Sequence, residues 1–371
     1  MNATAPATGP SPLIRAVALA AGAAVIVGVV LLAFAWPAVT SEPRGLPVGV
    51  VGPDASVAQA TGMLEAQSGD ALSLTGEDSR DAAVAAIERR EIYGALVLGD
   101  TPTDMPEVLV ATAANAQVAQ MLQGIAAGME QQIDTQLRAA TEASIAQRVS
   151  DPATAPTEFT IPHAEVTVTD VVPLSDSDPR GAKLATAAFP LVLGGMAGAV
   201  LISFGVARAA HRVVALLVYA GAGGLLLGAI LQGMFGALQG SYWTNAVAIG
   251  LALAAITAPI VGLRSLLGPP GLGVGAVVMM LVANPISAAT MPVEFLLAPW
   301  GAVGQWFPPG AGATLLRELS YFPDASTAFP WTVLATWTAV GVLLTGVAVA
   351  RERKTIESDS PTDDPELVTA G

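Results

Sequence analysis

Six long apolar stretches run through the chain, and each is long enough to cross a membrane as an α-helix. Such a helix needs about 20 mostly apolar residues to cross a bilayer core of about 30 Å. None of the six contains Asp or Glu, the residues that mark proton or ion pathways within membranes. The sequence therefore predicts a membrane α-helical protein with six transmembrane helices. Their predicted bounds are 13–36, 184–206, 213–238, 243–263, 272–289 and 330–350.

Basic residues near the ends of these stretches predict the orientation of the helices. Lys and Arg are enriched in cytoplasmic loops, so the side that carries them is predicted to be cytoplasmic. Both termini then lie inside and the long segment 37–183 lies outside, as in a multi-pass protein of the bacterial plasma membrane. The basic residues used are Arg15, Arg208, Arg212, Arg264, Arg351, Arg353 and Lys354.

The first apolar stretch is predicted to stay in the protein as a signal anchor. Ala33-Phe-Ala35 resembles a signal-peptide cleavage site, but the apolar run exceeds the 7–15 residues of a signal h-region. The chain then divides into seven predicted segments. They are a short cytoplasmic N-terminus (1–12), transmembrane helix 1 (13–36), an extracytoplasmic α/β domain (37–183), transmembrane helices 2–5 (184–289), an outer-face helical hairpin (290–329), transmembrane helix 6 (330–350) and an acidic cytoplasmic tail (351–371).

The segment between the first two apolar stretches has the periodicity of an α/β domain. Strands alternate with helices in the order β-α-β-α-β, which implies a parallel sheet for the first three strands. A long helix with an apolar stripe follows, and its far end extends beyond the sheet that it covers. We expect one face to pack on the sheet, with the far end packing on a second copy or a partner as the alternative. Predicted strands are 46–52, 71–75, 93–98, 107–111 and 165–172, and predicted helices are 56–67, about 81–88 and 115–147.

Composition and charge narrow the classes of function. The chain is 53% hydrophobic and 12% charged, far below the roughly 25% charged residues of soluble domains. Residues 37–183 hold 21 Asp and Glu against 8 Lys and Arg, a net charge of −13. Such a surface repels nucleic acid, so no nucleic-acid partner is predicted. The chain contains no cysteine, so disulfides and thiolate metal sites are excluded.

The sequence offers no catalytic machinery, and we expect a protein that is not an enzyme and has no cofactor or metal site. A P-loop needs a lysine after a glycine, and neither Lys183 nor Lys354 follows one. Gly271-Leu-Gly-Val-Gly275 resembles a dinucleotide loop, but it opens a membrane helix, where glycines serve tight helix packing. His163 is the only histidine placed for hydrolytic chemistry, and no nucleophile motif lies near it.

Three groups of residues are candidates for functional roles. Asp178, Pro179, Arg180 and Gly181 precede the second apolar stretch and are a candidate coupler between the outer domain and the membrane helices. A second group is a candidate outer hairpin or gate, predicted to dip into the outer leaflet, in which Glu294 and Arg317 are placed to pair. The third group is a candidate contact for a cytoplasmic partner. The second group is Asn284, Pro285, Glu294, Pro308, Pro309, Gly310 and Arg317; the third is Arg208, His211 and Arg212.

The layout resembles the ABC-2-type exporter permeases, in the branch with a large extracytoplasmic domain between the first two spans. Phage infection (Pip) proteins and actinobacterial ABC transporter permease proteins look similar. The resemblance implies a homodimeric permease that exports lipids, drugs or polymers with energy from a separate ATP-binding subunit. The residues that carry it are 46–54, 92–98, 178–181 leading into 190–195, Asn284-Pro285 and 308–312.

Two hypotheses of different classes stay open. An export permease is the first, and the lack of intramembrane acids means that its energy must come from a partner. The second is an envelope receptor or scaffold that transports nothing, and the short predicted inner loops favour it. Only about six residues separate the second and third stretches, which leaves an ATPase little to bind.

Overall fold

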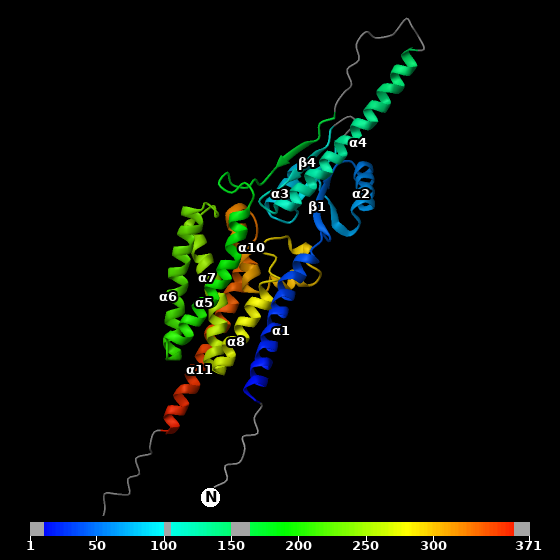
Figure 1. Ribbon diagram of the computed structural model, residues 1–371. Coiled ribbons are helices and arrows are strands. Elements are labelled where there is room, and N and C mark those ends of the chain that lie inside the picture. Colours follow the sequence, from blue (N-terminus) through cyan, green and yellow to red (C-terminus); the bar gives the residue numbers. More distant parts are fainter. Residues whose placement is uncertain (1–10, 100–104, 150–163, 360–371) are drawn as a thin grey trace, which may run out of the picture.

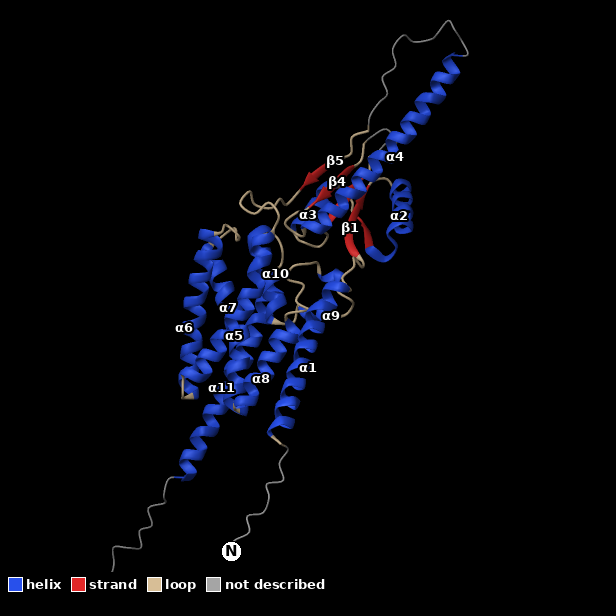
Figure 2. Ribbon diagram, in the orientation of Figure 1, coloured by secondary structure: helices blue, strands red, loops and turns tan. Residues whose placement is uncertain are grey.

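The computed structural model describes residues 11–99, 105–149 and 164–359, and it has two parts. A sheet domain lies at one end and a bundle of long helices lies at the other, with α1 (Pro12–Val39) leading from the bundle side up to the first strand. Figure 2 shows all strands gathered in the sheet domain. Residues 1–10 of the predicted N-terminus (1–12), residues 360–371 of the predicted tail (351–371), and His163 lie outside the described residues.

The sheet has five strands in the order β2-β1-β3-β4-β5. The strands β1, β2 and β3 are parallel, as the sequence predicts. Strand β4 runs antiparallel to β3, because only nine residues join them and a parallel crossover needs a dozen or more. Strand β5 returns parallel to β4. The strands are β1 (Leu46–Val51), β2 (Leu72–Gly76), β3 (Gly94–Val97), β4 (Glu107–Val110) and β5 (Thr167–Asp170).

Helices cover both faces of this sheet, and alternating side chains form a core on each face. Helices α2 (Asp54–Ser68) and α4 (Ala116–Val149) share one core with Leu96 and Val108. Helix α3 (Arg80–Glu88) packs on the opposite face, against the neighbouring positions of the same strands. A short 3₁₀ turn, η1 (Gly69–Ala71), joins α2 to β2.

Helix α4 is the long helix that the apolar stripe predicts. It has 34 residues, or about 51 Å at 1.5 Å per residue. Val118 and Leu122 are buried against the sheet. Figure 1 shows the helix continuing well past the sheet domain. Its first turns therefore pack as expected, and the packing of its far end on a second copy stays a prediction.

The helical bundle is built around α7 (Tyr242–Leu267), which is buried along most of its length. Helices α5 (Ala182–Gly205), α6 (Ala209–Gly228) and α11 (Ala328–Asp359) pack against it. Close approach depends on small residues, as expected for membrane helices. A Cβ on Gly224 would lie 2.3 Å from the Ala246 carbonyl oxygen, and one on Gly271 would lie 2.1 Å from the Leu263 carbonyl oxygen. The Gly271–Gly275 segment is thus a helix-packing element, as the sequence predicts.

The remaining helical segments extend the bundle toward the sheet domain. Helix α6 continues as a π-helix, η2 (Ala229–Met234), and α8 (Pro269–Val277) continues as η3 (Val278–Ala283). A chain of short elements then leads to α11. They are η4 (Val293–Phe295), α9 (Trp300–Gly304) and α10 (Pro308–Tyr321).

Five helices among the described residues are long and apolar enough to cross a membrane, so the chain is a membrane protein of the α-helical class. They are Pro12–Val39, Ala182–Gly205, Ala209–Met234, Tyr242–Leu267 and Ala328–Lys354. The fifth predicted span corresponds to Pro269–Ala283, which is shorter. Its 15 residues would reach only about 23 Å, less than a bilayer core of about 30 Å. Asn284 and Pro285 follow Ala283 directly, so the apolar stretch outlasts the helix.

One ion pair of the sheet domain makes its stability depend on pH. Arg80 donates to both carboxylate oxygens of Glu107, at 2.7 and 2.9 Å, and Thr169 donates to the same carboxylate at 2.6 Å. The bond from Arg80, followed by that from Thr169, holds the pKa of Glu107 below its usual value. This stabilisation is fully present above the pKa of Glu107 in the unfolded chain. It is lost as the pH falls through the lower folded-state pKa.

Replacing Arg80 with glutamine is therefore expected to cost about 0.5 kcal/mol at neutral pH, because the pair is partly exposed. The variant should also lose less stability than the native protein as the pH falls below 4.5. Thermal unfolding measured between pH 7 and pH 3 checks this. Arg89→Gln is the matched control, since its pair with Glu91 is exposed. Identical pH profiles for Arg80→Gln and the native protein would refute the assignment.

Candidate functional site

The sheet domain and the helical bundle meet through two aromatic side chains of the segment between η3 and α11. Phe322, at the end of α10, is 1% exposed and belongs to the core around α3, with Ile87 and Leu109. Phe295, in η4, packs against the other core of the sheet domain. The candidate hairpin therefore contributes to both hydrophobic cores of the sheet domain. These contacts connect the sheet domain directly to the helical bundle.

Polar contacts between the two parts surround these aromatic anchors. Arg90 donates to Glu318 of α10 at 3.2 Å, and both side chains are mostly buried, at 16% and 11% exposed. The Arg90 guanidinium also lies 5.9 Å from the ring centre of Phe322, within cation–π range. Tyr93 donates its hydroxyl to Glu294 at 2.8 Å. Burial, and then the charge of Glu294, raises the pKa of Tyr93.

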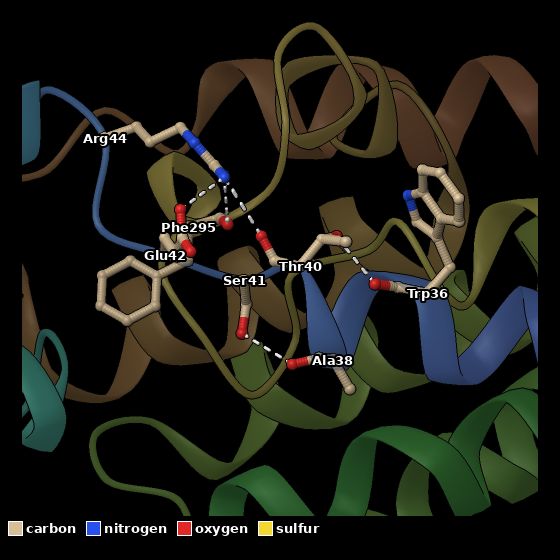
Figure 3. Close-up of polar contacts among 7 residues, drawn as sticks. All are labelled: Trp36, Ala38, Thr40, Ser41, Glu42, Arg44 and Phe295. Atoms are coloured by element: carbon tan, nitrogen blue, oxygen red, sulfur yellow. Dashed lines mark hydrogen bonds and ion pairs between the residues drawn. The ribbon is translucent and has the colours of Figure 1, made fainter.

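The connection from α1 to β1 is also attached to the hairpin (Figure 3). Arg44 donates to the carbonyl oxygens of Thr40, at 3.3 Å, and Phe295, at 3.5 Å, and it pairs with Glu42 at 3.0 Å. The Glu42 amide donates to the same Phe295 carbonyl at 3.1 Å. The Thr40 hydroxyl donates to the Trp36 carbonyl, and the Ser41 hydroxyl donates to the Ala38 carbonyl. These two bonds lie at the C-terminal end of α1. The end of α1 and the hairpin are thus held together.

The candidate coupler forms the turn that starts α5. Asp178 is 3% exposed and accepts hydrogen bonds from the amides of Lys183, at 2.9 Å, and Leu184, at 3.4 Å. This is a helix-capping contact in which the carboxylate satisfies free amides of the first turn. Gly181 has a φ of +65°, a conformation that a Cβ disfavours. Pro179 and Arg180 lie on the exposed side of this turn.

The same turn is tied to the connection between α6 and α7. Ser177 donates its hydroxyl to the Gly236 carbonyl at 2.9 Å. The Lys183 ammonium group donates to the carbonyls of Phe235, at 3.0 Å, and Ser177. The residues that follow β5 are thereby fixed to the start of α5 and to the connection between α6 and α7. That geometry is compatible with the coupler prediction and does not test it.

The hairpin residues form a compact turn with close backbone contacts. A Cβ on Gly304 would lie 1.7 Å from the Ile286 carbonyl oxygen, and one on Gly310 would lie 2.3 Å from the Gly304 carbonyl oxygen. The Asn284 carbonyl accepts from the hydroxyl of Ser287 at 2.7 Å. Pro308 and Pro309 begin α10 and are buried. The two predicted short helices are α9 and α10.

The predicted pairing of Glu294 with Arg317 is wrong. Glu294 is bonded to Tyr93, and Arg317 donates to the Ala289 carbonyl at 3.3 Å. The sequence predicted that both residues lie on one hairpin. It did not predict that the sheet domain packs against this hairpin. The hydroxyl of Tyr93 occupies the position at Glu294 that the prediction gave to Arg317.

An apolar cleft of about 520 Å³ separates α1 from the rest of the bundle. One wall is the last three turns of α1, including Ala33, and the other includes η3, Pro285 and Trp300. Most of α1 packs against nothing else among the described residues: no residue of its most apolar stretch is buried. The apolar surface of α1 is therefore left uncovered by the other described residues.

The end of the bundle that lies away from the sheet domain, here called the distal end, holds the third candidate group. Arg212 is buried and donates to the Ser265 hydroxyl at 2.8 Å and to the Val206 carbonyl at 2.9 Å. Its guanidinium thus joins α5, α6 and α7. These contacts use its hydrogen-bond donors within the bundle. Arg208 and His211 are exposed.

Sequence reasoning missed the residues that join the two parts, above all Arg90, Tyr93 and Phe322. Arg90 and Glu318 are 228 positions apart, and no local periodicity links them. One weak signal was present at Phe322, which lies at the edge of an apolar segment that is interrupted by proline and glycine. Among the described residues, no group of three or more His, Cys, Asp or Glu is placed to hold a metal ion.

Comparisons of the chain with known protein families, with curated proteins and with solved structures give no match. The assignment of a function therefore depends on the geometry of the chain itself.

Proposed function

We propose that this chain is a permease-type subunit that exports an apolar or amphipathic compound, with energy from a separate ATP-binding subunit. The observation that carries the proposal is the apolar cleft between α1 and the rest of the bundle. It opens beside membrane-length helices, and its apolar walls fit a lipid chain or a lipophilic drug. A cargo in it would lie next to the contacts that attach the hairpin to the sheet domain.

The proposed orientation has the sheet domain on the outer side of a bacterial plasma membrane. Basic residues support it, because Arg208, Arg212, Arg264 and Arg351 all belong to the distal end, at the ends of α5, α6, α7 and the apolar part of α11. Lys and Arg favour the cytoplasmic side. In this arrangement α8 and η3 form a sixth, shorter span, and α9 and α10 complete its passage at the outer leaflet. Broken helices are tolerated where protein covers their backbone.

The proposed site of energy coupling is the distal end. Helix α11 continues to Asp359, past Ala350, where its long apolar run ends. Its polar continuation and the exposed Arg208 and His211 offer a surface to an ATP-binding subunit. Arg212 is excluded from that surface, because it is bonded within the bundle. A homodimer is part of the proposal, as the resemblance to ABC-2-type permeases implies.

The alternative is an envelope receptor or scaffold, and the short distal loops favour it. Three residues join α5 to α6, and Gly268 alone separates α7 from α8. Neither loop provides a helix for an ATPase to contact. The two functions differ in whether the apolar cleft must stay open.

Filling the cleft tests the proposal. In a deletion strain, the native chain should lower the accumulation of lipophilic dyes or restore the lipid composition of the outer leaflet. Ala33→Trp places a large ring in the cleft and should abolish this rescue. Ala24→Trp, on an exposed part of α1 outside the cleft, should retain it.

Membrane abundance of both variants is measured so that loss of protein is not read as loss of transport. A strain whose dye accumulation and outer-leaflet lipids are unchanged by the deletion would contradict export and favour the scaffold. Equal rescue by Ala33→Trp and Ala24→Trp would contradict the role of the cleft.

A further inference from the structure

A second cavity lies where the sheet domain, the coupler and the hairpin meet. It has a volume of about 250 Å³. Thr112 and Asn115 of the sheet domain, Arg180 of the coupler, and Thr290, Arg317 and Tyr321 of the hairpin segment are among the residues that line it. It is separate from the apolar cleft beside α1, and the two share no lining residue.

Two arginines line this cavity, and neither forms an ion pair with a carboxylate in the described part of the chain. Arg317 makes one hydrogen bond, to the Ala289 carbonyl, and Arg180 is exposed at the turn before α5. Arg317 stays charged at neutral pH, because a guanidinium group is not deprotonated in proteins. A charge held away from water is costly unless an opposite charge meets it.

The carboxylates closest to this cavity are already occupied. Glu318 is bonded to Arg90, and Asp170 is bonded to the amide and the hydroxyl of Thr112. Asp178 is bonded to the amides of Lys183 and Leu184. The charged side chains among the residues that line the cavity are both arginines, although residues 37–183 carry a net charge of −13 in the sequence. Two arginines thus line a cavity within an acidic part of the chain, and this contrast needs an explanation.

Polar groups around the arginines suit an anion with several oxygens. Two helices, α4 and α5, begin at the cavity wall, and helix N-termini favour negative charge. Asn115 and Asp178 already cap the first amides of these helices, so the arginines supply the main attraction. Guanidinium groups bind phosphate through paired hydrogen bonds. A phosphate group presents its oxygens in a tetrahedral arrangement, so two arginines from different segments can each bind to it.

We propose that the cavity lined by Arg180 and Arg317 binds a phosphate group. The group would contact the β4–α4 loop, the coupler and α10 together, and would strengthen the junction between the two parts. The phosphate has two possible sources, a phospholipid headgroup of the outer leaflet or a free phosphate in solution. The proposal goes beyond the export function and holds equally for a scaffold.

The test uses the purified full-length chain in micelles of dodecyl maltoside, a detergent that carries no phosphate. Thermal unfolding is followed by tryptophan fluorescence, with inorganic phosphate added against sodium chloride of equal ionic strength. A second arm adds phosphatidylglycerol to the micelles. Ligand that binds only the folded state raises the midpoint of unfolding, here by a few degrees. Variants are Arg180→Gln, Arg180→Gln/Arg317→Gln, and Arg353→Gln as a matched loss of charge at the distal end.

A rise with phosphate that is present in Arg353→Gln and absent in the double variant supports the site with a free phosphate as ligand. A rise only with phosphatidylglycerol, with the same dependence on the arginines, supports the site with a lipid headgroup. Arg180→Gln alters only an exposed side chain, so it reports on the site even where the double variant fails to fold. No rise in either arm, or an equal rise in Arg180→Gln and the native chain, would overturn the proposal.

Discussion

Replacing Gly341 with valine is expected to unfold the helical bundle well below the unfolding temperature of the native protein. Gly341 lies where α11 crosses α7. A Cβ at this position would lie 2.2 Å from the Ala258 carbonyl carbon and 2.3 Å from the Pro259 nitrogen. Both are backbone atoms of the central helix, so no flexible side chain is available to move. The helices must separate or shift along their whole contact.

The expected cost is about 3 kcal/mol, the upper end for overpacking of a core, because α7 packs against most of the bundle. Thermal unfolding in detergent, followed by circular dichroism and size-exclusion chromatography, measures it. Gly346→Val is the matched control: it lies on the same helix, and a Cβ there meets nothing within 4 Å. Similar unfolding temperatures for the two variants would contradict the packing of α11 against α7.

The sequence predicts the strands well because their apolar residues are local and alternate with the period of a sheet. All five predicted strands are present within a few residues. The reversal of β4 is not encoded in that period, since side-chain alternation is the same for both strand directions. What settles it is the length of the connection between Val97 and Glu107, a feature that the periodicity argument did not use.

Hydropathy likewise overestimates the length of the fifth predicted span. Residues 272–289 are mostly apolar, yet the helix stops at Ala283. Asn284 and Pro285 follow and start the turn that leads to the hairpin. Composition averaged over a window does not register such an interruption. Contacts between distant segments escape sequence reasoning altogether, as Tyr93 with Glu294 shows.

Thiol labelling is expected to reach the sheet domain from outside the cell and the distal end only from within. The chain has no cysteine, so each introduced thiol is the single reactive group. Glu65 lies on α2 of the sheet domain and Arg353 lies on α11 beyond its apolar part, and both are exposed. Substituting either surface residue should change stability by less than about 0.5 kcal/mol. Accessibility then reports only on the side of the membrane.

The most direct test of the account is the labelling of Glu65→Cys and Arg353→Cys with a membrane-impermeant maleimide in cells whose plasma membrane is intact. The account predicts that Glu65→Cys is labelled completely, and that Arg353→Cys reacts only after the cells are permeabilised. Labelling of Arg353→Cys with protection of Glu65→Cys would reverse the orientation and contradict an exporter whose sheet domain lies outside.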